Sequence, residues 1–193
     1  MAWLRRKKKR PAEVPRQPEL RVLESERLTL VAANTLLVSL DLENSPALQE
    51  ILAAEVPPNW PPELYDRPAM KYALRQLGDP AEQRWSFWYL VSTVEGLSQL
   101  VGICGFKGRP DNTGSVEIGY SILDQYQNMG YATEAVNRLV AWAFNHHEVC
   151  EVSAETLPHL QQSIRVMEKN GFTYTGAGSE MGVVRYAVSR PDR

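Results

Sequence analysis

The alternation of apolar and polar residues along the chain predicts a series of β-strands. In the first of them, Leu28, Leu30 and Ala32 fall on one side of an extended backbone, which is the period-two pattern of a strand with a buried face. The turn signal Glu95-Gly96 predicts a hairpin between the second and third strands. Strands are expected at residues 20–33, 85–94, 100–106, 115–123, 149–156, 172–175 and 183–188.

Helical spacing of apolar residues predicts helices between these strands. The clearest helix covers residues 130–145, where Val136, Leu139 and Ala143 recur at helical intervals. Further helices are expected at residues 34–40, 46–55, 63–77 and 159–170, with Asn34 and Ser45 as the N-caps of the first two. Strands interspersed with helices indicate an α/β (α+β) layer architecture.

The composition is that of one globular domain with an uneven distribution of charge. The chain has 193 residues, of which 44% are hydrophobic, and a single domain is expected over residues 20–193. Residues 1–16 carry seven basic side chains and one acidic one, so the rest of the chain has a net charge of −8 when the whole has −2. Residues 1–19 are predicted to be a disordered basic tail. The run from Arg5 to Arg10 either contacts RNA, the ribosome or acidic lipid, or is simply solvated.

Location and metal binding are predicted from what the sequence lacks. No run of about 18 apolar residues is present, and the basic cluster is not followed by an apolar segment, so we expect a cytoplasmic protein without a membrane span or secretory signal. Cys104 and Cys150 lie in apolar runs and are expected to be buried thiols. No histidine or cysteine cluster has the spacing of a metal site, so no metal is expected.

A polar turn at residues 124–130 joins a predicted strand to the clearest predicted helix. Gly130 and Ala132 place little side-chain bulk at the start of that helix. Because first-turn N–H groups lack helical partners and the helix dipole is positive there, such a turn can bind a phosphate group. The same pattern also fits an ordinary strand-to-helix turn.

Three segments resemble the GNAT superfamily of acetyl-CoA-dependent N-acetyltransferases. Gln127-x-x-Gly130-x-Ala132 matches the Q/R-x-x-G-x-G/A signature, VEIGY at residues 116–120 matches the preceding strand, and SIRVMEKNGF at residues 163–172 matches the final helix. The amino-acid sequence of these segments is most similar to the ribosomal-protein N-terminal alanine acetyltransferase branch (RimJ/RimL-like). The resemblance implies a central, mixed but mostly antiparallel twisted sheet of about seven strands flanked by helices. It also implies direct transfer of acetyl from acetyl-CoA to an amine.

The resemblance also assigns the residues that would hold acetyl-CoA. It implies that the edge of the central strand near Ile122 and Leu123 pairs with the pantetheine arm. Gln127 stands where many members have arginine, so one charged contact to phosphate is missing. The residues implied to bind the pyrophosphate are Gln127, Asn128, Met129, Gly130, Tyr131, Ala132 and Thr133.

Glu117 and Ser163 are the candidate catalytic residues. On the predicted strand, Glu117 faces away from Val116, so it is expected in a cleft where it removes a proton from the amine, directly or through water. The alternative is a structural carboxylate paired with an arginine. By resemblance, Ser163 serves the leaving thiolate. Met167 and Leu160 depart from the family, because they replace the usual tyrosine acid and an asparagine that contacts pantetheine.

The expected activity is N-acetyltransfer to a primary amine, either a protein N-terminus or a small molecule. Trp60 and Tyr65 lie in the insertion that covers the acceptor side in the family, so they are expected either to bind the acceptor or to pack a proline-rich loop. The departures at Leu160 and Met167 keep open a second function, a non-catalytic acyl-CoA-binding sensor or scaffold whose basic tail contacts nucleic acid. The sequence leaves monomer and homodimer equally open.

Overall fold

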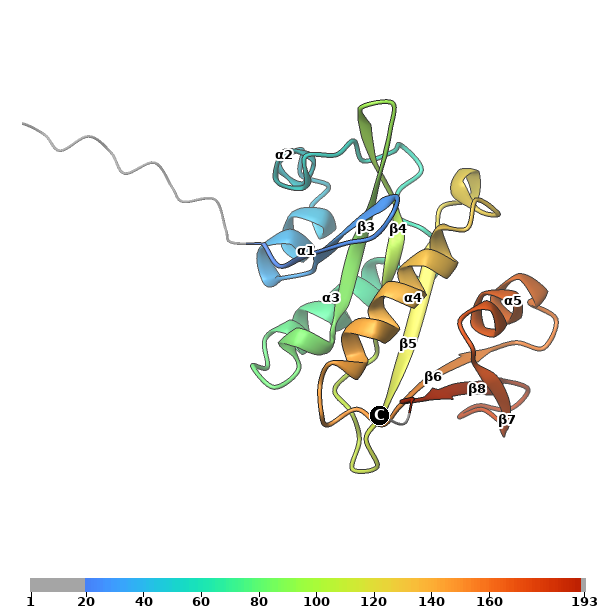
Figure 1. The fold of residues 1–193 in the computed structure, drawn as a ribbon. Helices are drawn as coiled ribbons and strands as arrows, with labels where there is room; N and C mark the ends of the chain where they lie inside the picture. The colour runs from blue at the N-terminus through green and yellow to red at the C-terminus, as the bar shows by residue number, and fades with distance from the viewer. Residues whose placement is uncertain (1–19, 192–193) are drawn as a thin grey trace, which may run out of the picture.

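The computed structural model describes residues 20–191, which form one sheet with helices on both faces (Figure 1). The predicted basic tail at residues 1–19 lies outside the described residues. The helices are α1 (Thr35–Leu42), α2 (Ala47–Leu52), α3 (Arg67–Leu77), α4 (Tyr131–Phe144) and α5 (Gln161–Lys169). The strands are β1 (Val22–Glu24), β2 (Leu28–Ala32), β3 (Phe87–Val94), β4 (Leu97–Phe106), β5 (Ser115–Ile122), β6 (Glu151–Thr156), β7 (Thr173–Ala177) and β8 (Val184–Ser189).

The sheet is antiparallel except at its centre. The strand order is β1-β2-β3-β4-β5-β6-β8-β7, and β5 and β6 are its parallel pair. That pair joins only Ser115–Glu117 to Glu151–Ser153, although β5 continues to Ile122 and β6 to Thr156. Beyond Glu117 the two strands no longer pair, so one backbone edge of β5 is free.

Alternating residues of the central strands bury their side chains on opposite faces of the sheet. On one face, Trp88 belongs to a core that includes Leu139 of α4. On the other, Tyr89 belongs to a core that includes Leu37 of α1 and Met70 of α3. This alternation follows the period-two pattern of a strand and places a helical layer on each face of the sheet.

The predicted first strand is wrong in one respect, because residues 20–33 form the β1–β2 hairpin instead of one strand. The chain turns at Ser25, whose backbone N–H and hydroxyl both donate to the carbonyl of Leu28. The sheet therefore has eight strands, and the mixed, mostly antiparallel arrangement is confirmed.

Two predicted helices extended three or four residues too far at one end. The second ends at Leu52 instead of residue 55, because Ala53 has a left-handed backbone (φ 48°) and Glu55 bonds to the backbone of β4. The third begins at Arg67 instead of residue 63, because Asp66 caps the helix by accepting from the N–H of Ala69. The prediction that Cys150 is buried was also wrong, whereas Cys104 is buried.

No helix among residues 20–191 is long and apolar enough to cross a membrane. Within the same residues, no group of three or more histidine, cysteine or acidic side chains is arranged to hold a metal ion.

Candidate active site

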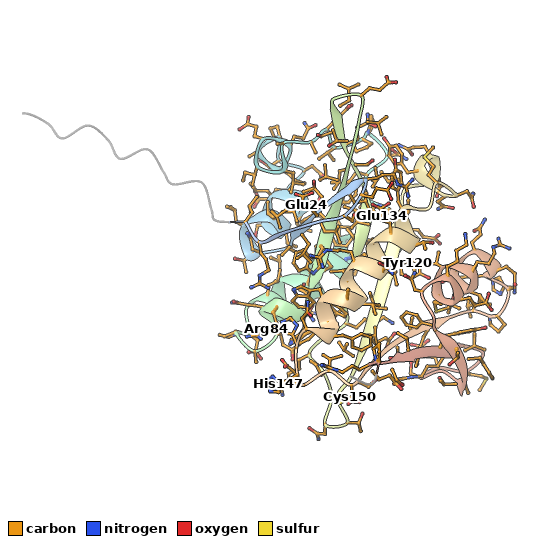
Figure 2. The ribbon with its side chains drawn as sticks, in the orientation of Figure 1. Glu24, Arg84, Tyr120, Glu134, His147 and Cys150 are labelled. Carbon is orange, nitrogen blue, oxygen red and sulfur yellow. The ribbon has the colours of Figure 1, made fainter. Side chains whose placement is uncertain are left out.

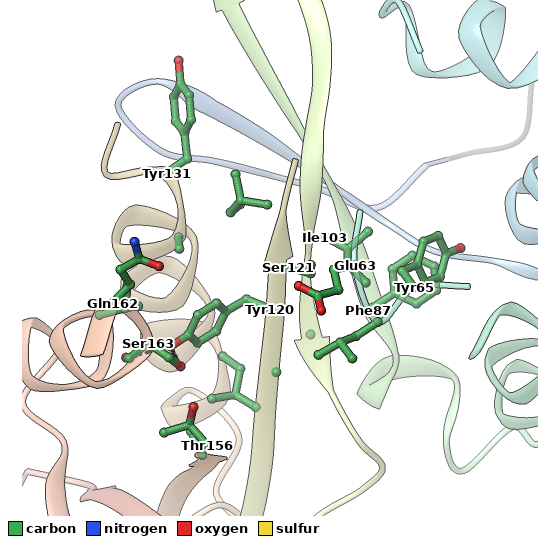
Figure 3. Close-up of a pocket in the computed structure, with 18 of the residues that line it drawn as sticks. Glu63, Tyr65, Phe87, Ile103, Tyr120, Ser121, Tyr131, Thr156, Gln162 and Ser163 are labelled. Carbon is green, nitrogen blue, oxygen red and sulfur yellow. Dashed lines mark hydrogen bonds between the residues drawn. The ribbon is translucent and has the colours of Figure 1, made fainter. Parts of the chain in front are cut away.

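A cavity of about 760 Å³ passes through the sheet where β5 separates from β6. On one side of β5 it is lined by Tyr120 together with α5, and on the other by Ser121 together with α3, β3 and β4. Figure 3 shows this division: Glu63, Tyr65, Phe87 and Ile103 lie on one side of β5, and Tyr120, Thr156, Gln162 and Ser163 on the other. The cavity thus connects both faces of the sheet.

One end of the cavity is the turn that the sequence predicts to bind phosphate. All seven residues from Gln127 to Thr133 line it, as does Ile122, whereas Leu123 is buried and does not line it. Gly130 is the N-cap of α4, with a left-handed backbone (φ 88°) and no side-chain cap. In the described residues, the N–H groups of residues 131–133 therefore keep no helical or capping partner and point out of the helix start.

The side chain of Gln127 stabilises the turn itself. Its amide nitrogen donates to the carbonyl of Ile122 at 3.1 Å and to Oδ1 of Asp124 at 2.9 Å. Asn128, the next residue, adopts a left-handed backbone with φ 62°. The polar residues of this turn therefore fix its shape and leave the N–H groups of residues 131–133 free.

Arg27 lies on the β1–β2 hairpin and contacts this turn, which the sequence pattern did not predict. Its guanidinium donates to the carbonyl of Met129 at 2.9 Å, pairs with Glu134 at 2.8 Å and lies 5.0 Å from the ring centre of Tyr131. Burial alone raises the pKa of Glu134, but hydrogen bonds from Arg27 and Ser25 outweigh it and hold the pKa below 4.5. Glu134 is therefore ionised at neutral pH and completes the clamp.

One face of α5 adds two cations to the same end of the cavity. Gln162, Arg165, Val166 and Lys169 line it, which is a stripe at intervals of three and four residues. The Asn170 side-chain amide donates to the carbonyl of Thr133 at 3.2 Å, so the end of α5 lies against the start of α4. Arg165 and Lys169 can supply the positive charge that Gln127 does not. Their spacing in the sequence could have shown this.

Ser163 lies at the middle of the cavity, hydrogen-bonded to a tyrosine from β5. The hydroxyl of Tyr120 is 3.0 Å from Oγ of Ser163 and donates to the Ser163 carbonyl at 3.0 Å. Burial raises the pKa of Tyr120 to about 12. Met167 is 1% exposed and packs in the core, so α5 carries no polar side chain there. The tyrosine at this site comes from the central strand.

Glu117 lies outside the cavity lining. Its carboxylate forms an ion pair with the ammonium group of Lys107, which does line the cavity. This placement supports the alternative expectation of a paired structural carboxylate, with a lysine in place of an arginine. Glu63 lies on the same side of β5 as Tyr65 and Phe87, and it lines the cavity there.

The two predicted acceptor residues lie in different surroundings. Tyr65 lines the cavity with its ring, while its hydroxyl is buried 3.2 Å from that of Tyr89. Trp60 is not part of the lining; its indole N–H donates to Asp41 at 2.8 Å. Asp41 is 2% exposed and also accepts from Tyr89 at 3.0 Å. Trp60 therefore packs the proline-rich loop, as the alternative expectation holds, and the network holds Tyr65 at the cavity wall.

Comparison with known proteins agrees with this geometry. Residues 34–173 match the family model described as an acetyltransferase (GNAT) domain. An uncharacterized N-acetyltransferase of Bacillus subtilis (strain 168), YjdG, is 32% identical over 82 residues, which are 42% of this chain and 49% of that protein. The chain thus spans about half the length of the curated relatives it matches.

Solved structures share the fold at low identity. Ribosomal-protein-S5-alanine acetyltransferase from Vibrio fischeri superposes with a TM-score of 0.63 at 17% identity, covering 89% of this chain and 98% of that one. The microcin C7 self-immunity acetyltransferase MccE, solved with acetyl-CoA and AMP, superposes with a TM-score of 0.58 at 14% identity, covering 86% and 94%. Because the family model covers most of the described residues, the chain belongs to the GNAT acetyltransferase family.

Proposed function

We propose that the protein transfers acetyl from acetyl-CoA to a primary amine. The observation that carries this proposal is the single cavity that joins a bare helix N-terminus, a free strand edge and an acceptor chamber across the sheet. Family membership and the acetyl-CoA bound by MccE, a structural neighbour, support the choice of acyl donor. The ribosomal-protein acetyltransferases among the neighbours support a primary amine as acceptor.

The residues of the turn fit a pyrophosphate. The free N–H groups at residues 131–133 donate to phosphate oxygens, and the dipole of α4 favours their negative charge. Gly130 exposes its backbone, and Arg165 and Lys169 on α5 add positive charge. The pantetheine arm then lies along the unpaired edge of β5 from Ile118 to Ile122, as an added strand pairs with a sheet edge.

The reaction is a direct attack at the thioester. The neutral amine donates its lone pair to the carbonyl carbon, an N–C bond forms and the C–S bond breaks, leaving the amide and the CoA thiolate. The nitrogen loses one proton and the sulfur gains one, so an amine and acetyl-CoA give an N-acetyl amine and CoA. The cavity contributes by holding the two reactants in line on opposite sides of β5.

The Tyr120–Ser163 pair lies where it can stabilise the leaving thiolate. An ordinary thiol has a pKa of about 8.5, so proton transfer to it from Tyr120 is uphill by about 5 kcal/mol. The pair therefore serves as a hydrogen-bond donor to sulfur, and the final proton comes from the amine or from water. Ser163 thus interacts with the thiolate as a hydrogen-bonding group, together with Tyr120.

The test follows the fate of radiolabelled acetyl from acetyl-CoA. Purified full-length protein is incubated with a lysate of its source that has been separated into low-mass and macromolecular fractions. Heat-inactivated protein is the control. Enzyme-dependent label in either fraction supports acetyltransfer, and the fraction identifies the kind of amine.

A protein that binds acetyl-CoA in a calorimetric titration but transfers no label would overturn the proposal. That result would favour the second function, a non-catalytic acyl-CoA sensor. A protein that does not bind acetyl-CoA would contradict both functions.

A further inference from the structure

Resting on the proposed function, we propose that the acceptor is a small monoamine whose nitrogen is carried on a short chain from an aromatic ring. The inference comes from the acceptor chamber, defined as the part of the cavity between β5 and α3. Its lining comes from the loop before α3, from α3 itself and from β3, β4 and β5. The side chains used below are Glu63, Tyr65, Tyr72, Phe87 and Ile103.

The walls of the acceptor chamber are aromatic and apolar. The rings of Tyr65 and Phe87 pack with their centres 4.9 Å apart at an interplanar angle of 59°. Tyr72 of α3 is 53% exposed at the mouth, and Ile103 of β4 completes the wall opposite. Rings that meet at such angles accommodate a further ring by edge-to-face packing, so these walls favour a flat aromatic guest.

The floor of the acceptor chamber is left open by a small residue. Gly119 lines the cavity on β5, and a Cβ built there lies 3.9 Å from its nearest neighbour, Cε of Lys107. Its backbone is not left-handed, so no conformational demand calls for glycine at this position. The missing side chain leaves room that a ligand can occupy.

Charge in the acceptor chamber favours one ammonium group. Glu63 is exposed and, among the described residues lining this chamber, supplies the carboxylate. Lys107 also lines it, but its charge is matched by Glu117. A polyamine needs several carboxylates, and a phosphorylated acceptor needs unpaired cations, so neither matches this lining. A single ammonium group beside Glu63 does.

The backbone before α3 fixes Glu63 at the rim. Leu64 has a left-handed backbone with φ 66°, and the next residue, Tyr65, is anchored by its buried hydroxyl. Non-glycine residues in this conformation persist where their surroundings hold them, which is common at ligand sites. Glu63 thus holds the ammonium group at the rim of the acceptor chamber, and the amine attacks the thioester in its neutral form after it loses a proton to water.

The test measures CoA release by the full-length protein with three acceptors: tyramine, spermidine and a peptide that begins with alanine. We expect kcat/KM for tyramine to exceed that for the other two by about tenfold or more, given the binding worth of an aromatic pocket. Glu63→Gln should lower kcat/KM for tyramine about tenfold, because the amide keeps the shape but loses the charge. Glu50→Gln, an exposed carboxylate on α2, is the matched control and should change nothing.

Gly119→Val is the second variant and fills the floor of the acceptor chamber. It should abolish measurable tyramine turnover while acetyl-CoA still binds, because the phosphate turn is untouched and the pantetheine arm pairs with the backbone of β5, which valine retains. Faster turnover of spermidine or of the peptide would overturn this inference and leave the proposed function standing. Equal activity of Glu63→Gln and wild type would also overturn it. If none of the three acceptors causes CoA release and no label is transferred to any lysate fraction, the proposed function itself is overturned.

Discussion

The buried carboxylate of Asp41 offers the most quantitative test of how the acceptor side is held together. Asp41 is 2% exposed and accepts two hydrogen bonds, from the indole N–H of Trp60 at 2.8 Å and from the hydroxyl of Tyr89 at 3.0 Å. Asp41→Leu keeps the branched shape with larger end groups and removes both acceptors. Asp41→Asn removes the charge but keeps one acceptor oxygen.

The structure sets the expected size of each effect. In Asp41→Leu the hydroxyl of Tyr89 can still donate to Tyr65, 3.2 Å away, so Trp60 is the donor left without a partner. A buried donor without a partner costs about 1–3 kcal/mol, and removal of a buried charge returns part of this, so we expect a loss of about 2 kcal/mol in the free energy of unfolding. Asp41→Asn should lose less than about 1 kcal/mol, because its oxygen serves Trp60 and the phenol of Tyr89 can accept from its amide.

The pH dependence of this comparison has a definite sign. Burial raises the pKa of Asp41 above 3.8, even though the hydrogen bonds from Trp60, Tyr89 and Tyr65 act to lower it. The folded state therefore favours the protonated carboxyl, and this contribution is complete below the unfolded-state pKa. It is lost as pH rises through the raised folded-state pKa. Wild type should lose stability relative to Asp41→Asn as pH rises above about 4.

Urea denaturation followed by tryptophan fluorescence measures these differences at several pH values. Glu43→Gln, an exposed carboxylate just after α1, is the control and should stay within about 0.5 kcal/mol of wild type. Asp41→Leu with wild-type stability would refute the reasoning, as would a wild-type advantage over Asp41→Asn that grows with pH.

Four further substitutions test the cofactor side. Tyr120→Phe and Ser163→Ala should each lower kcat about tenfold with little change in acetyl-CoA affinity. Because the two hydroxyls act as a pair, the decrease in kcat of the double variant should be smaller than the product of the two single decreases. A decrease equal to that product would contradict this. Glu134→Gln should cost about 1 kcal/mol of unfolding free energy at pH 7, a cost that shrinks as pH falls through the lowered pKa of Glu134, whereas a cost constant down to pH 3 would refute the clamp to Arg27. Gly130→Ala places a Cβ 3.1 Å from Nη2 of Arg27 on a backbone with φ 88°. Calorimetry should therefore find weaker acetyl-CoA binding, and thermal unfolding should find a stability lower by about 1 kcal/mol.

Local sequence pattern predicted the elements that depend on local chemistry. Asn34 caps α1 as expected, accepting from the N–H of Leu37 at 2.8 Å. The turn before α4 was recognised because its glycine and the helix that follows are contiguous in the sequence. The apolar periodicity of residues 130–145 placed α4 within one residue at each end. These features need no knowledge of distant partners.

The remaining features depend on residues far apart in the chain. Arg27 contacts the carbonyl of Met129 across 102 positions, and Trp60 donates to Asp41 across 19. Neither contact leaves a periodic signal, so the clamp on the phosphate turn and the buried acid were not predicted. The pairing of β5 with β6 that stops at Glu117 is likewise a property of the sheet, and it decides that Tyr120 lies in the cavity.

The most direct test of the central claim is a crystal structure of the full-length protein with acetyl-CoA. The account predicts pyrophosphate oxygens within hydrogen-bond distance of the N–H groups of residues 131–133, pantetheine along the unpaired edge of β5, and the thioester sulfur beside the hydroxyls of Tyr120 and Ser163. Acetyl-CoA bound elsewhere, or with its sulfur directed away from the Tyr120–Ser163 pair, would contradict it.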